Sequence, residues 1–114
     1  AEEAVLWTGE QDEAAAVEAL KDFADTFAIT RGGSGSLVWD GRELHELPTE
    51  PVKAVDTTGA GDLWASGFLS GILTDCGLEE SARRGAVLGA HVVQQLGAWI
   101  PDEDWPELRN QLGL

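Results

Sequence analysis

The chain has 114 residues, of which 43% are hydrophobic, so it is long enough and apolar enough to bury a core of its own. Seven Lys and Arg stand against 21 Asp and Glu, which gives a formal charge of −14. Because nucleic acids and anionic membranes are bound through basic patches, this charge argues against both as partners, and any bound phosphate must be held locally.

Cysteine usage and hydropathy indicate the cellular compartment of the protein. Cys76 is the single cysteine, so the chain forms no internal disulfide. The sequence contains neither a signal-peptide pattern nor an apolar run near the length of a membrane span. These features predict a cytoplasmic protein and give no indication of a secreted, disulfide-rich scaffold.

The first quarter of the chain predicts two helices. The first covers residues 3–8 and ends at Gly9, and the second opens at Gln11 or Asp12. Apolar residues recur on one face of this second helix: Val17, Leu20, Phe23 and Ala24.

The next segment predicts strands separated by turns. Phe27–Thr30 reads as a short buried strand and Ser36–Trp39 as a second one. Asp40 followed by Gly41 is a strong hairpin signal, which returns the chain through residues 43–47. The glycine-rich turn over residues 31–35 is weak evidence of function by itself, because such turns more often merely connect strands.

The organising stretch of the chain runs from residue 52 to residue 73. Val52–Val55 is a β-branched run that predicts a strand, and it leads to a tight turn at Gly59-Ala60-Gly61. Apolar residues then recur at helical spacing and predict a buried helix that ends near residues 75–77: Leu63, Trp64, Phe68, Leu69, Ile72 and Leu73. Because the first N–H groups of such a helix lack intrahelical partners and carry partial positive charge, the turn predicts an anion site, with phosphate as the anion.

Asp62 places a carboxylate directly after these glycines. A carboxylate repels a phosphate unless it has a task there, and that task is to accept a proton from a hydroxyl that attacks the phosphorus. The alternative is that Asp62 only complements the helix dipole, which is worth roughly 0.3–1 kcal/mol.

The last third of the chain predicts two more helices. Glu79–Leu96 is the first, and small residues gather on one of its sides: Gly85, Ala86, Gly89 and Ala90. Such a side either packs closely against the helix over residues 63–73 or lets a flat ligand approach, and packing is favoured. Pro101–Leu112 predicts a short acidic helix. His45 and His91 have no partner at metal-ligand spacing and read as structural.

The stretch Asp56-Thr57-Thr58-Gly59-Ala60-Gly61-Asp62 resembles the Asp-Thr-x-Gly-Ala-Gly-Asp signature of the PfkB, or ribokinase-like, family of small-molecule kinases. The following Ala-Ser-Gly-Phe-Leu is also similar to that family. The resemblance implies an α/β fold, the C-terminal part of a ribokinase-like (Rossmann-like) α/β/α sandwich. It also implies ATP-dependent phosphorylation of an alcohol of a sugar or nucleoside, with the adenosine-kinase-like branch slightly favoured.

Roles follow from the resemblance position by position. It implies that Asp62 is the catalytic base and that the amides of Gly59, Ala60 and Gly61 form the anion hole. A monovalent cation, potassium by its oxygen ligands, is implied beside Asp56 and Thr58. The Gly97-Ala98 turn would complete that cation site with backbone oxygens.

The resemblance also implies residues for the nucleotide and for magnesium. Thr30, Gly32 and Gly35 match the family's Thr-x-Gly-x-x-Gly loop and become candidates for the ATP phosphates and ribose. Arg31 stands at the variable position of that loop, where it either adds charge near the phosphates or points to solvent. Ala86 is the candidate on the helix that lies near adenine, and Glu3 falls on the Glu of an Asn-x-x-Glu motif that organises Mg²⁺ and its waters.

The resemblance covers nearly the whole chain. Residues 1–114 are expected to be the nucleotide-binding and catalytic-base part of such a kinase, and the amino-terminal part with the acceptor site and lid is absent from this sequence. The expected activity is phosphoryl transfer that this part does not perform alone. The alternative is a non-catalytic nucleotide-binding module, and the sequence does not predict the oligomeric state.

Overall fold

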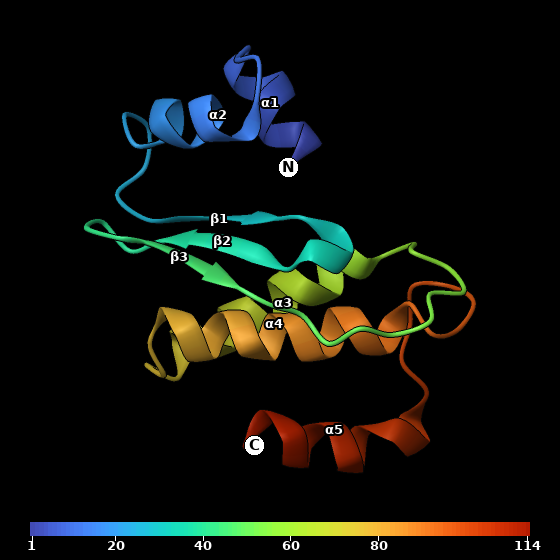
Figure 1. Cartoon of the computed structure of the whole chain (residues 1–114). Helices are drawn as coiled ribbons and strands as arrows, with labels where there is room; N and C mark the ends of the chain where they lie inside the picture. Colours follow the sequence, from blue (N-terminus) through green and yellow to red (C-terminus); the bar gives the residue numbers. More distant parts are fainter. The chain divides into compact units, whose positions relative to one another are not determined.

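The computed structural model describes all 114 residues and divides into two compact units, Ala1–Leu47 and Pro48–Leu114. Both units combine helices with extended segments (Figure 1). None of the helices has the length and apolar character that crossing a bilayer requires.

The first unit contains two helices and a three-stranded antiparallel sheet of order β1-β2-β3. The elements are α1 (Glu2–Thr8), α2 (Glu13–Leu20), β1 (Phe27–Thr30), a 3-10 turn (Gly32–Ser34), β2 (Ser36–Trp39) and β3 (Leu44–Leu47). Thr30 pairs with Ser36 in the first ladder, and Trp39 pairs with Leu44 in the second. The predicted strands and hairpin are therefore confirmed.

The core of the first unit joins α2 to the first two strands. Val17, Ile29 and Leu37 are its buried residues. Asp12 begins α2 as predicted, since its side chain accepts a hydrogen bond from the Ala15 amide at 2.9 Å. The predicted apolar face was wrong at Phe23: α2 ends at Leu20, so helical spacing no longer applies there, and Phe23 is exposed.

Asp40 closes the hairpin between β2 and β3. Its Oδ1 accepts the amides of Arg42 and Glu43, both at 2.7 Å, and its Oδ2 lies 2.7 Å from Nε2 of His45. The Glu43 amide, then His45 and the Arg42 amide, lower the pKa of Asp40 from 3.8 to about 2.

We expect Asp40→Asn to lower the unfolding temperature at neutral pH and to lose this effect in acid. The folded pKa of Asp40 lies below the unfolded one, so its stabilisation is full above about pH 4 and is lost as the pH falls through about 2. Thermal unfolding followed by circular dichroism across this range measures the difference between variant and wild type. Asp22→Asn is the control, since the Asp22 side chain makes no hydrogen bond, and a pH-independent difference for Asp40→Asn would contradict the assignment.

The second unit begins with an extended segment, and the predicted strand over Val52–Val55 was wrong. A strand requires a ladder with a neighbouring strand. Here the amides of Val55 and Asp56 both donate to one acceptor, the carbonyl of Val93, at 2.7 and 3.1 Å. Val52 and Val55 are also exposed, so the β-branched run has neither a ladder nor a core to enter.

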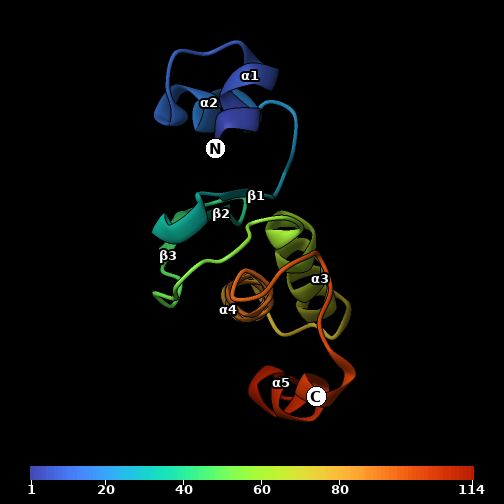
Figure 2. The same ribbon diagram turned by 90° about the vertical axis from the view of Figure 1, so that its right-hand side faces the viewer.

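Three helices form the rest of the second unit: α3 (Ala60–Leu73), α4 (Leu78–Val92) and, after a 3-10 turn (Asp102–Asp104), α5 (Trp105–Leu112). Figure 2 shows α4 nearly end-on, with α3 beside it and α5 on another of its sides. The predicted glycine turn, both later helices and the small-residue contact between α3 and α4 are present. Their order in the chain is the predicted one.

The prediction that the helix after the glycine turn is buried was only half right. Gly67 and Gly71 of α3 are buried against α4. The opposite side is not covered within the chain, because Leu69 and Ile72 are about half exposed and Leu73 is 85% exposed. Helical spacing identified the element but did not say which of its apolar sides is covered.

The end of α4 also differs from the prediction, since the helix stops at Val92 and not at Leu96. In a continuing helix the Gly97 amide would donate to the carbonyl of Val93. That carbonyl is taken by the two amides that precede α3, and the Gly97 amide donates to Asp56 Oδ2 at 3.0 Å. The segment before α3 therefore occupies both groups of a hydrogen bond that an extension of α4 as far as Leu96 would need.

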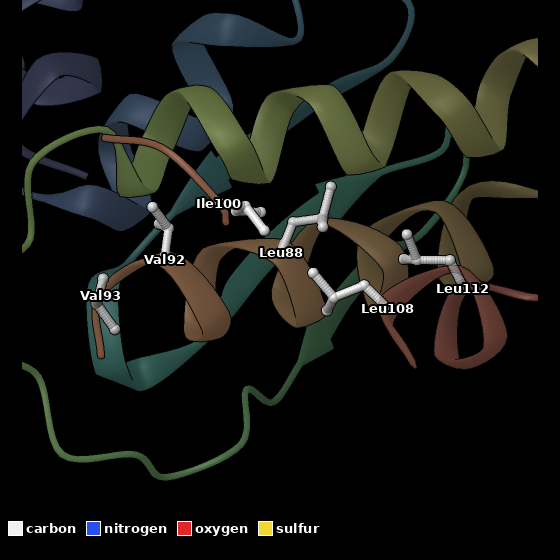
Figure 3. Packing of buried hydrophobic residues seen from close by; sticks show 6 residues of the cluster. All are labelled: Leu88, Val92, Val93, Ile100, Leu108 and Leu112. Atoms are coloured by element: carbon white, nitrogen blue, oxygen red, sulfur yellow. The ribbon is translucent and has the colours of Figure 1, made fainter. Parts of the chain in front are cut away.

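The core of the second unit lies between α4, α5 and the chain that joins them. Figure 3 shows its buried residues gathered along one side of α4: Leu88, Val92, Val93, Ile100, Leu108 and Leu112. Ala60 and Leu63, in the first turn of α3, pack against the same cluster. This contact anchors the amino-terminal end of α3, where the predicted anion site lies, to the best-packed part of the unit.

Candidate functional site

The amino-terminal end of α3 presents unpaired backbone donors. The Ala60 amide donates to the Thr57 carbonyl at 3.2 Å, but the amides of Gly59, Gly61 and Asp62 have no partner within the chain. Because these donors coincide with the positive end of the helix dipole, they can bind the oxygens of an anion. The donor set therefore differs slightly from the predicted one: Asp62 contributes an amide, and the Ala60 amide is already engaged.

Gly59 has a steric role at this turn. Its φ of 77° lies in the left-handed region, which favours glycine. A Cβ at this position would also overlap the Cβ of Ala98. The turn before α3 therefore lies directly against the turn after α4, which only a residue without a side chain permits.

Asp62 lies in the first turn of α3 and is exposed. Its side chain makes no hydrogen bond, while its carbonyl accepts the Ser66 hydroxyl at 2.9 Å. An unpaired carboxylate beside unpaired amides can both help orient a hydroxyl and accept its proton. Complementing the helix dipole is the alternative role, and free amides accompany both roles because every α-helix leaves its first N–H groups without intrahelical partners.

Asp56 connects the two turns. Its Oδ1 accepts the Thr58 hydroxyl at 2.6 Å and the Thr58 amide at 2.9 Å, and its Oδ2 accepts the Gly97 amide at 3.0 Å. The Thr58 hydroxyl, followed by the Gly97 and Thr58 amides, lowers the pKa of Asp56 to about 2. Asp56 therefore stays ionised and holds a negative charge between the turns.

The oxygens around Asp56 fit a hard cation. A carboxylate offers about four lone-pair sites and three are used here, so one remains. The Gly97 and Ala98 carbonyls accept no hydrogen bond within the chain, and the oxygen of Thr58 keeps its lone pairs when its hydroxyl donates. Such oxygen donors suit a hard cation rather than a soft one.

The chain has no cluster of the kind that holds a divalent metal by itself. No group of three or more His, Cys, Asp or Glu residues lies close enough to bind one ion. His45 pairs with Asp40, and His91 pairs with Asp104 at 2.9 Å, so both histidines have structural partners, as the sequence predicted. Glu3 lies exposed in the first turn of α1.

The candidate nucleotide loop lies in the first unit, between β1 and β2. Thr30 ends β1, Gly32 opens the 3-10 turn with a φ of 56°, and Gly35 follows it with a φ of 89°. The Arg31 amide donates to the Gly35 carbonyl at 2.8 Å and closes the loop. Gly32 is exposed, and a Cβ there would meet nothing within 4 Å, so its backbone is open to close approach. Gly35 is buried, and its amide and carbonyl both form hydrogen bonds within the loop.

Arg31 is paired inside the first unit. Its Nη2 lies 2.8 Å from a carboxylate oxygen of Glu46, and Nη1 lies 3.5 Å from one of Glu13. The hydrogen bond to Glu46, with smaller contributions from both carboxylates, raises the pKa of Arg31 above its usual value. Much of its charge is therefore neutralised locally.

The small-residue side of α4 is used mostly for packing. A Cβ on Gly85 would lie 2.9 Å from ring atoms of Trp64, and Gly89 also faces Trp64. The indole ring of Trp64 in turn stacks on Phe68 with centroids 5.0 Å apart. Ala86 is half-buried on the same helix. Packing against α3, the favoured alternative, thus accounts for both glycines.

Sequence reasoning missed the carbonyl of Val93. It binds the segment that leads into the glycine turn, and it is a backbone group on a residue that reads only as core. No sequence pattern indicates which carbonyl leaves a helical ladder. In contrast, the resemblance had already implied that Asp56 and the Gly97-Ala98 turn belong to one cation site.

Comparison with known proteins gives a family match over most of the chain. The family model of the pfkB family carbohydrate kinases matches residues 1–105. A cytidine kinase of Thermococcus kodakarensis is 41% identical over 100 residues, which cover 85% of this chain and 36% of that protein. The chain spans about a third of the length of this relative and of the solved structures it matches.

Two solved structures are similar in fold. The adenosine kinase of Sinorhizobium meliloti has a TM-score of 0.87 and 32% identity, over 95% of this chain and 33% of that one. A double mutant of the fructokinase of Vibrio cholerae O395, with fructose, ADP and a potassium ion bound, has a TM-score of 0.80 and 27% identity, over 85% of this chain and 34% of that one. These similarities confirm the predicted α/β, ribokinase-like fold, and the chain belongs to the PfkB family of carbohydrate kinases.

Proposed function

We propose that the chain is the nucleotide-binding and catalytic-base part of an ATP-dependent kinase that phosphorylates a hydroxyl of a sugar or nucleoside. The observation that carries the proposal is the end of α3, where the unpaired Asp62 carboxylate adjoins the free amides of Gly59, Gly61 and Asp62. Its membership of a kinase family, and relatives that act on cytidine and adenosine, support this reaction and acceptor class.

The mechanism assigns one task to each group at the end of α3. The free amides bind oxygens of the transferring phosphoryl group and offset the charge that develops there. Asp62 accepts the proton of the acceptor hydroxyl as its oxygen attacks the phosphorus. The Gly59–Ala98 contact and the Leu63 anchor hold these groups in place before the substrates arrive.

ATP is assigned to the loop and helix that the family resemblance indicates. Thr30, Gly32 and Gly35 would hold the phosphates and ribose, and Ala86 would contribute to the adenine side of the site. Glu3 would help to hold Mg²⁺ through its waters, and a bound magnesium ion would neutralise charge on the ATP phosphates. The exposure of Glu3 and of Gly32 is compatible with these tasks.

Potassium is assigned to the oxygens around Asp56. Its ligands would be Asp56, Thr58 and the carbonyls of the Gly97-Ala98 turn. A bound cation there supplies positive charge next to the anion site. The support is the all-oxygen donor set together with a fructokinase relative whose structure contains potassium.

The test is an acceptor panel with the intact protein. ATP, Mg²⁺ and potassium are supplied with nucleosides such as cytidine and adenosine and with sugars such as fructose and ribose, and ADP release is measured. We expect release that depends on one acceptor class, and little or none from residues 1–114 alone. ATP binding without acceptor-dependent release would favour the non-catalytic nucleotide-binding module, and transfer by residues 1–114 alone would refute the part-enzyme proposal.

A further inference from the structure

Gln95 makes an unusual contact just beyond the end of α4. Its side-chain Nε2 donates to the carbonyl of Trp99 at 2.7 Å. This hydrogen bond spans the Gly97-Ala98 turn from one end to the other. The neighbouring Gln94 behaves differently, because its Nε2 folds back onto α4 and donates to the Ala90 carbonyl at 3.0 Å.

The turn that Gln95 spans has few other supports. No backbone–backbone hydrogen bond involves residues 96–99, and the Gln95 amide makes only a long contact of 3.5 Å with the Val92 carbonyl. Packing comes from Ala98, which lies against Gly59, while Leu96 is 74% exposed and Trp99 61% exposed. The hydrogen bonds that fix the turn are therefore two side-chain contacts, Asp56 to the Gly97 amide and Gln95 to Trp99.

The position of this turn determines the geometry of the candidate cation site. The Gly97 and Ala98 carbonyls are free to bind a cation, but a carbonyl points correctly only if the peptide units around it are held. Asp56 holds the turn at the Gly97 amide, where it faces the site. Gln95 holds the turn at the Trp99 carbonyl, and it lies outside the set of residues that would touch the ion.

We infer that Gln95 is a positioning residue for the potassium site: it sets the orientation of the Gly97 and Ala98 carbonyls through its hydrogen bond to Trp99. The inference rests on the proposed potassium role of these carbonyls. Gln95 does not touch the ion, the nucleotide or the acceptor. Loss of its donor loosens the turn and weakens cation binding, while the nucleotide loop between β1 and β2 is unaltered.

Methionine substitutions test this with a matched pair of variants. Gln95→Met keeps the length of the side chain and adds no charge, but it removes the donor to Trp99. Gln94→Met removes the donor to Ala90 in the same way, on the helix side. The intact protein is titrated with KCl at constant ionic strength, with tetramethylammonium chloride as the balancing salt, and the rise in unfolding temperature is recorded without substrates.

We expect Gln95→Met to raise the potassium concentration for half-maximal stabilisation about ten-fold, as loss of outer-shell partners does at metal sites. Its KM for ATP at saturating potassium should stay within about two-fold of wild type, because only the affinity for the ion is altered. Gln94→Met should match wild type in the half-maximal potassium concentration and in the KM for ATP. Hydrogen exchange of the Gly97 amide without potassium is a second readout, and it should be faster in Gln95→Met only.

Three outcomes overturn the inference. An unchanged potassium response and unchanged Gly97 exchange in Gln95→Met would show that the turn does not need this hydrogen bond. Equal changes of the potassium response in Gln94→Met would show that loss of any side-chain donor at the end of α4 has the same effect. A wild-type protein stabilised no better by potassium than by tetramethylammonium would remove the proposed cation site as well, which separates failure of that proposal from failure of the role of Gln95.

Discussion

Asp62→Asn should lower kcat for phosphoryl transfer about 10²–10⁴-fold, the range that general-base catalysis contributes. Asparagine has nearly the shape of aspartate, so the free amides at the end of α3 keep their positions. It cannot take the proton of the acceptor hydroxyl. ATP affinity should remain the same or rise slightly, because a negative charge next to the phosphates has been removed.

The measurement is kcat from acceptor-dependent ADP release, with the dissociation constant of ATP from calorimetry, in the intact protein. Asp75→Asn is the matched control: Asp75 follows the carboxyl end of α3, and its side chain makes no hydrogen bond. It also stands at a φ of 56°, which asparagine tolerates. Equal losses of turnover and ATP affinity in Asp62→Asn would assign Asp62 to binding and refute its role as the base.

The site was more predictable from the sequence than the packing around it. A free-amide turn, a carboxylate after it and a helix behind it are consequences of residues 56–73, so local chemistry was enough to place them, while the role of Asp62 as the base comes from the family resemblance. The tie between Asp56 and Gly97 joins residues 41 positions apart, and only the family resemblance brought its two ends together.

The errors share one physical cause, which is that burial depends on what lies beside an element. Val52–Val55 has the composition of a strand, but its amides meet a single carbonyl and not a ladder. Leu69, Ile72 and Leu73 have helical spacing, yet the first two are about half exposed and the third is 85% exposed. The end of α4 was misplaced because two groups that would extend the helix, the Val93 carbonyl and the Gly97 amide, bind a segment remote in sequence. Hydrophobic periodicity identifies the local repeat but does not indicate which remote segments lie beside an element.

The contact between α3 and α4 provides the second large expected effect. A Cβ on Gly67 would lie 2.5 Å from the carbonyl oxygen of Arg84 and 2.8 Å from Cα of Gly85, and one on Gly71 would overlap Ser81. For Gly67 both obstacles are backbone atoms of α4, so they cannot rotate away. The two helices approach this closely only because both positions lack a side chain.

We expect Gly67→Ala to destabilise the protein although alanine is the better helix former. Alanine is favoured over glycine by about 1 kcal/mol in a helix interior. Overpacking costs roughly 1–3 kcal/mol, and the upper end applies because relief requires moving one helix away from the other. The net loss should be about 1–2 kcal/mol for Gly67→Ala and larger for the double variant with Gly71→Ala. Urea denaturation followed by circular dichroism measures it.

Gly61→Ala separates this steric effect from helix propensity. Gly61 lies in the first turn of the same helix, and a Cβ there would meet nothing within 4 Å. Its substitution should therefore leave stability unchanged or raise it by up to about 1 kcal/mol. If Gly67→Ala stabilised the protein as well, α3 and α4 would have room to separate. The packing of the first turn of α3 against the core would then be looser than the close approach of the two helices implies. If only the Gly67 and Gly71 variants lose stability, close contact between these helices is what keeps α3, with Asp62 in its first turn, in place.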